Sequence, residues 1–241
     1  MAAINKFQKD AKNIDSTLNV SGRFSFQQTA MKLVVGDIVQ KLNLAPEDTL
    51  MDIGCNCGDL TIPLSFVCEK VMGIDGVDTI ERLKKRTTEI PNIETMAGDF
   101  MELEITEKYD CILIYSVLMY IESYEQKLDF VLKAAKCLKS GGRLLVGDVV
   151  NSSRKKRFSS TRIGEKVNKE YHENMEKLTE ADKEAHEESE DMKNLWILDD
   201  FYLMKLLLDV RNAGYESYLL PQKHELPFGY TRDDILIYAW N

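Results

Sequence analysis

The sequence predicts an α/β fold in which a mostly parallel sheet is flanked by helices. Between residues 49 and 150, short apolar runs alternate with segments whose apolar residues recur at helical spacing. One of these runs, YDCILIYS (109–116), is apolar on both faces, as a central strand of a parallel sheet is. Strands that alternate with helices at this spacing are typical of parallel sheets with crossover helices.

The predicted elements follow one another with short connections. The segment FQQTAMKLVVGDIVQKL (26–42) has helical periodicity, and Pro46 marks the loop after it. In a later helix, residues 124–142, we expect Gly141 to form the C-terminal cap. Up to residue 150, strands are predicted over 49–54, 70–75, 93–98, 109–116 and 143–150, and the remaining helices over 59–69 and 77–90.

The alternation stops after Asn151. Residues 151–195 are polar and charged, and within them 164–191 predicts a solvated helix or helix pair. A last helix is predicted over 198–215, capped by Asp199 or Asp200, and two further strands over 215–220 and 234–240 bring the total to seven. We expect one domain over 1–241, with an N-terminal helical region (1–45), a core (46–150), a helical insertion or lid (151–195), and a C-terminal helix with two strands (196–241).

Composition and charge exclude several classes of protein. Hydrophobic residues make up 44% of the 241 residues and charged residues 29%, which is typical of an ordinary globular chain. The longest apolar run, 111–121, is shorter than the roughly 20 residues that span a bilayer, and the N-terminus lacks a secretory signal. We therefore expect a cytoplasmic protein with no membrane partner. The formal net charge of -9 argues against nucleic acid as a partner.

The stretch DIGCNCGDL (52–60) has two interpretations. Cys55 and Cys57 form a C-x-C pair that could hold a metal, whereas Gly54 and Gly58 could form the tight turn of a cofactor loop. A structural zinc site needs about four ligands, and the other three cysteines lie in separate predicted elements, so no metal site is predicted. The loop follows the first strand directly, which is where open α/β sheets bind ligands.

Acidic residues follow the next two predicted strands. Asp75 ends the second strand, where a carboxylate can accept both hydroxyls of a ribose. Asp99 and Phe100 follow the third strand and suit the amino group and ring face of an adenine. With these residues in place, the sequence resembles the class I methyltransferases that use S-adenosylmethionine, over about residues 26–150. The resemblance rests on LMDIGCNCG (50–58), GID (73–75), AGDF (97–100), YDCILIYSVLMYI (109–121) and LKSGGRLLVGD (138–148).

This resemblance implies a Rossmann-like fold whose last two strands form an antiparallel edge, and S-adenosylmethionine as the cofactor. It places Asp52, Gly54 and Gly58 at the methionine end of the cofactor, Asp75 at the ribose, and Asp99 with Phe100 at the adenine. The other candidate cofactor-binding residues are Cys55, Asn56, Gly76, Tyr115 and Ser116.

One residue of the loop departs from the family pattern, which usually has glycine at the position of Asn56. Asparagine is the residue other than glycine that best tolerates a positive φ, so the turn can still form. Cys57 lies near the predicted start of a helix, where we expect the pKa of its thiol to fall.

Two other functions remain as alternatives. A NAD-dependent oxidoreductase would carry a G-x-G-x-x-G loop, and the Gly-Cys-Asn-Cys-Gly-Asp of this chain lacks that spacing. A non-catalytic protein that binds S-adenosylmethionine is the other. Each site residue also has a structural interpretation, such as a turn glycine, a polar residue at a strand end or an aromatic residue of the core.

Methyl transfer from a sulfonium depends mainly on positioning the acceptor and excluding water, and a general base helps when a hydroxyl or a protonated amine is the acceptor. The candidate catalytic residues are Asp148, His224 and Tyr120. Asp148 ends the fifth strand and could be a base or a substrate contact, His224 could accept a proton, and Tyr120 should lie near the transferring methyl group. Their structural alternatives are a capping aspartate, a surface histidine and a packed tyrosine.

The charge is unevenly distributed after the fifth strand. Residues 154–162 carry five basic and no acidic side chains, whereas 165–191 carry eleven acidic and four basic ones. Arg154 and Arg157 could bind an anionic small-molecule acceptor, such as a phosphorylated or nucleotide-linked sugar. Alternatively, the basic segment pairs with the acidic one, closing a lid or bridging the subunits of a homodimer. Tyr171 could line the acceptor pocket.

Overall fold

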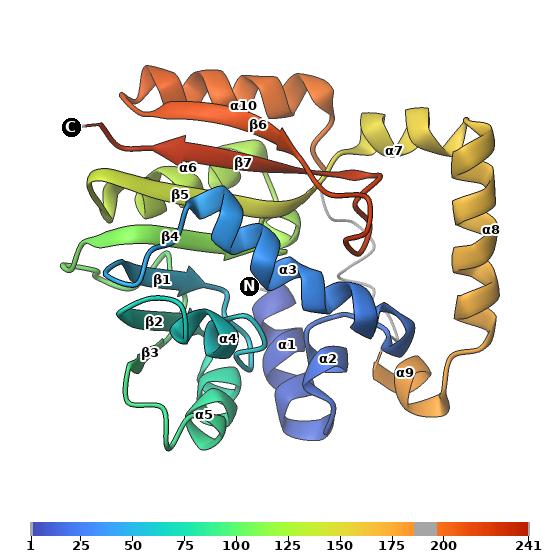
Figure 1. The fold of residues 1–241 in the computed structure, drawn as a ribbon, viewed down its shortest axis with the longest axis horizontal. Helices are drawn as coiled ribbons and strands as arrows, with labels where there is room; N and C mark the ends of the chain where they lie inside the picture. Colours follow the sequence, from blue (N-terminus) through green and yellow to red (C-terminus); the bar gives the residue numbers. More distant parts are fainter. Residues whose placement is uncertain (1, 186–196, 241) are drawn as a thin grey trace.

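The computed structural model describes residues 2–185 and 197–240, which include one seven-stranded sheet with the order β3-β2-β1-β4-β5-β7-β6 (Figure 1). Strands β1 to β5 are parallel, and β7 runs antiparallel to both β5 and β6. The predicted fold class is therefore confirmed. The strands are β1 (Thr49–Ile53), β2 (Lys70–Asp75), β3 (Ile93–Ala97), β4 (Tyr109–Tyr115), β5 (Leu138–Val150), β6 (Glu216–Pro221) and β7 (Arg232–Tyr238).

Helices cover both faces of the sheet, each through an apolar stripe. One core cluster joins the sheet to α6 and α10 through residues such as Val131 and Leu206, and a second joins it to α3 and α4 through residues such as Ile38 and Leu64. Burying one such side chain contributes about 1.5–3 kcal/mol to folding. These helices are α3 (Gln28–Leu42), α4 (Thr61–Ser65), α5 (Val77–Arg86), α6 (Tyr124–Lys136) and α10 (Asp200–Asn212).

The sheet order reverses direction between β1 and β4. The chain passes from β1 to β2 and β3 on one side, and then from β4 to β5 on the other. Ligands of open α/β sheets bind beyond the carboxyl ends of the strands at such a reversal. A ligand-binding site is therefore expected at the loops that follow β1, β4 and β5.

Several helix ends differ from expectation, and α4 ends at Ser65, four residues before its predicted end. The prediction that Gly141 caps the helix before β5 is wrong, because α6 already ends at Lys136 with Cys137 as its cap, and Leu138 pairs at once with Tyr109 of β4. Gly141, with φ 77°, instead forms an irregular turn inside β5, where its N–H donates to the carbonyl of Ala239. Helix α5 ends at Arg86, four residues before its predicted end. By contrast, Asp199 caps α10 as expected, by accepting the N–H of Tyr202.

The N-terminal region and the insertion both lie beyond the carboxyl ends of the parallel strands (Figure 1). The insertion forms an arm of α7 (Ser152–Ser159), α8 (Arg162–Glu176) and α9 (Glu180–Ala185). At the end of this arm, Asp182 accepts hydrogen bonds from the backbone N–H and the hydroxyl of Ser25, the latter at 2.8 Å. The N-terminal region contains α1 (Ala2–Asn13), α2 (Thr17–Val20) and the short helix η1 (Ser25–Gln27).

The predicted domain boundaries stay a prediction. None of the helices among the described residues is long and apolar enough to cross a membrane.

Candidate active site

Three residues at the carboxyl ends of the central strands have a left-handed backbone although none is glycine. Asn56 follows β1 with φ 49°, Ser116 follows β4 with φ 60°, and Asp148 lies near the end of β5 with φ 58°. Such conformations cost on the order of 1–3 kcal/mol each and tend to cluster at functional sites. Their grouping at one edge of the sheet marks this edge as the candidate site.

A cleft lies beside these residues, with about 850 Å³ of empty space that is partly open to solvent. Seven of its lining residues were predicted as site residues: Asp52, Gly54, Cys55, Asn56, Tyr115, Ser116 and Tyr120. The other lining residues are Phe7, Ser21, Arg23, Met31, Asp59, Leu60 and Val117. The N-terminal region therefore forms one wall of the cleft.

The glycine loop is shaped by close packing. A Cβ atom on Gly54 would lie 2.3 Å from a side-chain methyl of Val117, and one on Gly58 would lie 2.3 Å from a methyl of Leu83. Asn56 holds the turn itself, because its side-chain oxygen accepts the N–H of Cys57 at 2.6 Å and its amide donates to the carbonyl of Val20 at 3.2 Å. The asparagine that departs from the family pattern thus ties the loop to the N-terminal region.

The two acidic residues of the loop region are close enough to interact electrostatically. The Asp75 carboxylate accepts the backbone N–H groups of Asn56, at 2.7 Å, and Gly76, at 2.6 Å. Asp52 accepts the hydroxyl of Thr61 at 2.7 Å. Burial, together with the charge of Asp75, raises the pKa of Asp52 to about 7. Because burial opposes its ionised form, Asp52 favours a cationic ligand in the cleft.

The residues predicted to hold the adenine do not line the cleft. Phe100 is 4% exposed and packs edge-to-face on Phe130, with 5.1 Å between the ring centroids. Asp99 accepts the N–H of Met101. Gly76 is the N-cap of α5 and packs against Gln8 of α1, because a Cβ atom on Gly76 would lie 2.7 Å from that side chain. The packing of Phe100 favours its structural interpretation, and the roles of Asp99 and Gly76 stay predictions.

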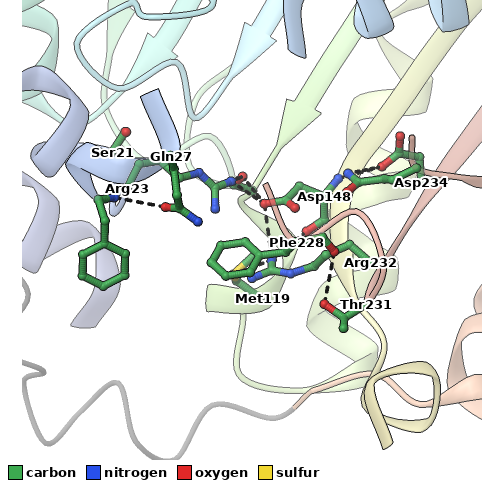
Figure 2. A network of polar contacts seen from close by, with 12 residues as sticks. Ser21, Arg23, Gln27, Met119, Asp148, Phe228, Thr231, Arg232 and Asp234 are labelled. Atoms are coloured by element: carbon green, nitrogen blue, oxygen red, sulfur yellow. Dashed lines mark hydrogen bonds and ion pairs between the residues drawn. The ribbon is translucent and has the colours of Figure 1, made fainter. Parts of the chain in front are cut away.

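Asp148 is the centre of a buried polar network (Figure 2). One carboxylate oxygen, Oδ2, accepts hydrogen bonds from Arg23 at 2.5 Å, Ser116 at 2.6 Å and Arg232 at 3.3 Å. Its backbone N–H donates to Asp234 at 2.8 Å. Burial alone would raise the pKa of Asp148, but Arg232 and Arg23 hold it below its ordinary value. An ionised, doubly paired carboxylate is a weak proton acceptor, so this geometry favours a contact or positioning role over that of a base.

Sequence reasoning missed both arginines of this network. Arg23 is only 6% exposed, and it lies in VSGRFSF, where no periodicity or motif distinguishes it. Arg232 begins β7 and was read as part of a loop. The only signal in the sequence was that Arg23 stands alone among small and apolar residues, which is too weak to predict a site.

Lys127 supports the loop that carries Tyr120, and it too was missed. Its side chain is 1% exposed, and its ammonium donates to the carbonyls of Leu118 and Ile121 on either side of the short helix η2 (Leu118–Tyr120). Tyr120 in turn packs edge-to-face on Phe7, with 5.1 Å between ring centroids. This contact closes part of the cleft with the N-terminal helix.

Three of the remaining candidates lie outside the cleft. His224 is exposed and stacks on Tyr230, with 4.5 Å between ring centroids. Arg154 pairs with Asp233 and donates to the carbonyl of Tyr230, and the exposed Arg157 pairs with Asp200. Within the described part of the chain, neither arginine pairs with residues 165–185 of the acidic segment. Residues 186–191 lie outside the described part, so pairing with the acidic segment stays a prediction.

Tyr171 of α8 lies close to the network. Its ring is 5.7 Å from that of Phe26 and 6.0 Å from that of Phe228. Burial raises the pKa of Tyr171, while the charges of Arg232 and Arg23 act in the opposite direction. Of the three candidate substrate-binding residues, Tyr171 alone is brought next to Asp148 and its partners.

The pKa of the Cys57 thiol differs from the prediction. Burial raises the pKa of Cys57 to about 11, so the prediction that it falls is wrong. The reason is that α4 begins only at Thr61, and that Cys57 packs against Ala11 and Val20. Among the described residues, no group of histidine, cysteine and acidic side chains could hold a metal ion.

Slow alkylation of Cys55 and Cys57 is expected in the folded protein, because burial also raises the pKa of Cys55 and thiolates are the reactive form. Iodoacetamide labelling followed by mass spectrometry measures both rates. Cofactor should slow Cys55 further, since Cys55 lines the cleft, and should affect Cys57 less. Equal rates for Cys55 with and without saturating cofactor would contradict its placement.

The sheet order, the glycine loop at the reversal and the cleft beside it are those of the class I S-adenosylmethionine-dependent methyltransferase fold. Solved structures share this fold. Phosphoethanolamine N-methyltransferase 1 of Haemonchus contortus, in complex with phosphoethanolamine and S-adenosylhomocysteine, superposes with a TM-score of 0.68 at 17% identity, covering 98% of this chain and 48% of that one. N-methyltransferase NodS of Bradyrhizobium japonicum WM9, in complex with S-adenosylhomocysteine, gives 0.60 at 16% identity, covering 98% and 96%.

Sequence comparison identifies the family. The family model of Nodulation protein S (NodS) matches residues 9–185, and the chain belongs to this family. Its curated relatives include a probable cobalt-precorrin-6B C(15)-methyltransferase (decarboxylating) of Methanococcus vannielii, 38% identical over 68 residues, which are 27% of this chain and 38% of the relative. Nodulation protein S of Sinorhizobium fredii is 24% identical over 113 residues, 46% of this chain and 52% of the relative. The matched segments thus span about a third to a half of these relatives.

The predicted family is confirmed, because the chain belongs to the Nodulation protein S family and has the Rossmann-like fold of S-adenosylmethionine-dependent methyltransferases. The comparisons lend no support to the NAD-dependent alternative.

Proposed function

We propose that this protein is an S-adenosylmethionine-dependent methyltransferase that acts on a small molecule carrying a negatively charged group. One observation carries the proposal: beside the cleft, Arg23 and Arg232 share the single carboxylate of Asp148. The neighbouring acidic residues Asp37 and Asp234 have lysine partners of their own, Lys41 and Lys223. Arg23, Arg232 and Asp148 together carry one net positive charge, which favours an anionic substrate group nearby.

The residues of the cleft fit the methionine end of the cofactor. Gly54 and Gly58 leave room for a close approach, and the buried Asp52 favours a positive charge such as that of an ammonium or a sulfonium. Bound there, S-adenosylmethionine supplies a methyl group that its sulfonium already activates. The task of the chain is then to orient the acceptor and to keep water out, for which Phe7 and Tyr120 form a closed wall.

Nitrogen is the acceptor atom that this cleft suits best. Asp148 stays ionised and paired, burial raises the pKa of Tyr115 and Tyr120, and none of the described residues that line the cleft is a histidine. Asp52 lines the cleft with a pKa near neutrality, but we place it at the cofactor end, so none of the described residues on the acceptor side is poised to deprotonate a hydroxyl. An amine in its neutral form needs no strong base. The names of two structural neighbours, both N-methyltransferases, point the same way.

An assay of S-adenosylhomocysteine formation with matched amine acceptors tests this function. The pairs are phosphoethanolamine with ethanolamine, and glucosamine 6-phosphate with glucosamine. We expect turnover with at least one phosphorylated member and a higher kcat/KM than for its neutral counterpart. Turnover confined to neutral acceptors would contradict an anionic substrate. The sugar pair also addresses the prediction of a carbohydrate acceptor, which stays a prediction.

Equilibrium titration separates the remaining alternatives. We expect S-adenosylmethionine and S-adenosylhomocysteine to bind and NADH not to bind. Tight cofactor binding without turnover of any amine or hydroxyl acceptor would favour the non-catalytic alternative. The predictions of a cytoplasmic location and a homodimer await their own measurements.

A further inference from the structure

We propose that Arg232 of β7, Phe228 of the β6–β7 loop and Tyr171 of α8 form an oxyanion subsite that binds a phosphate or carboxylate group of the acceptor. The inference rests on the function proposed above and adds to it the residues that select the acceptor. Figure 2 shows Arg232 and Phe228 beside Asp148, with Arg23 reaching the same carboxylate from another element.

Arg232 is held along one edge and available along the other. Its Nη1 donates to the carbonyl of Asp148 at 3.1 Å and to the Asp148 carboxylate at 3.3 Å, and it contacts the sulfur of Met119 at 3.6 Å. Within residues 2–185 and 197–240, Nε and Nη2 of Arg232 have no hydrogen-bond partner, and neither is a fully buried atom. A guanidinium offers parallel N–H groups that match an oxyanion, so the available edge is suited to a phosphate or a carboxylate.

Phe228 packs against this guanidinium. The guanidinium carbon of Arg232 lies 4.8 Å from the centre of the Phe228 ring, and that of Arg23 lies 5.5 Å from it. Phe228 has φ 61°, a conformation that is uncommon and costly for a bulky side chain. The strained turn is held by Thr231, whose N–H and hydroxyl both donate to the Phe228 carbonyl. The ring therefore keeps Arg232 in one orientation before the acceptor binds.

Tyr171 brings the insertion to the same place. Its ring packs 6.0 Å from Phe228, and its hydroxyl is close enough to Arg232 and Arg23 for their charges to affect it. A phenol can donate a hydrogen bond to an oxyanion that already contacts an arginine. The insertion thus supplies a donor to the oxyanion subsite, whereas its basic residues Arg154 and Arg157 are engaged elsewhere.

The other arginine of the network lines the cleft itself, whereas Arg232 is not among the lining residues. Arg23 lines the cleft with Gly54 and Asn56, and it donates to Ser116 at 2.6 Å as well as to Asp148. This is where the methionine end of the cofactor is expected, and that end carries its own carboxylate. We therefore assign Arg23 to the cofactor side and Arg232 to the acceptor side.

Binding of simple oxyanions to the protein saturated with S-adenosylhomocysteine tests the subsite without a known acceptor. Inorganic phosphate and acetate are the two probes, measured by calorimetry with chloride as the ionic-strength control. Because Arg232→Met removes a charged donor pair, it should weaken binding of at least one probe by about 10- to 100-fold. Arg232→Lys keeps the positive charge but lacks the paired N–H donors of a guanidinium, so it should weaken probe binding by a smaller factor. Arg157→Met, a matched change on the surface, should bind as the wild type does.

The outcomes separate this proposal from the function on which it rests. If S-adenosylhomocysteine itself fails to bind the wild type, the proposed function fails. If it binds but neither probe does, or if Arg232→Met binds the probes normally, the subsite assignment is overturned. Tyr171→Phe serves as a second variant that keeps the packing of α8, and it should weaken the better probe by a smaller factor. Unchanged affinity for S-adenosylhomocysteine in each variant shows that the variant is folded.

Discussion

Asp148→Asn is expected to lower the free energy of unfolding by about 3 kcal/mol, because it leaves the buried Arg23 and the half-buried Arg232 without their shared carboxylate. Methyl transfer should fall with it, since Arg23 and Arg232 lose the group that positions them. Urea unfolding followed by tryptophan fluorescence measures the first effect, and S-adenosylhomocysteine formation the second. Asp200→Asn, at an exposed ion pair with Arg157, is the matched control and should change stability little.

The pH dependence of this variant follows from the sign of the pKa shift. The folded state holds the pKa of Asp148 below its ordinary value. Its carboxylate therefore contributes stability above the pKa of the unfolded chain, about 4, and that contribution is lost as the pH falls through the lower folded-state value. The difference between wild type and Asp148→Asn should shrink in acid. A difference that stayed constant down to strongly acidic pH would contradict the ion-pair assignment.

Asp52→Asn is expected to stabilise the cofactor-free protein and to weaken its cofactor binding. Burial raises the pKa of Asp52 to about 7, so its contribution to stability is fully present below the unfolded-state pKa and is lost as the pH rises to about 7. At pH 8 the wild type has lost up to about 4 kcal/mol in this way, which asparagine avoids. The midpoint of thermal unfolding should therefore be higher for the variant at pH 8 and approach that of the wild type in acid.

Cofactor affinity should change in the opposite direction. Only ionised Asp52 attracts the positive charges of S-adenosylmethionine, so the affinity of the wild type should rise as the pH increases through about 7. Asp52→Asn should bind at least tenfold more weakly at pH 8 and lose this dependence, a factor that corresponds to about 1.4 kcal/mol. Calorimetric titration across this range measures both effects. Asp59→Asn changes a carboxylate of the same loop that pairs with Arg86, and it should keep the pH dependence of the wild type.

The sheet and the glycine loop could be predicted from the sequence because local patterns determine them. Apolar runs, three of which end in glycine or aspartate, gave the first four strands within about two residues, and Gly54 and Gly58 stand where close packing excludes a side chain. Gly141 was misplaced because a glycine suits a helix cap and a turn inside a strand equally well. The pKa of Cys57 was wrong because it depends on burial by Ala11 and Val20, which lie far from it in sequence.

The acceptor side of the site could not be predicted because no local pattern encodes it. Arg23 and Asp148 are 125 positions apart, and Arg232 and Asp148 are 84 apart. The basic run at 154–162 was the most conspicuous charge feature of the sequence, yet Arg154 and Arg157 pair with Asp233 and Asp200. A charge run identifies basic residues but not their partners, which depend on how the elements pack.

The contact between Ser25 and Asp182 couples the insertion to the N-terminal region, which matters for chimeras that exchange segments of this protein. Asp182 belongs to the insertion that supplies Tyr171, and Ser25 follows Arg23 by two residues in the segment that walls the cofactor cleft. A graft of residues 151–195 from a relative with another substrate would replace one half of this contact and keep the other. Such a chimera should inherit a new substrate preference together with an altered affinity for S-adenosylmethionine, unless the two halves are transplanted together.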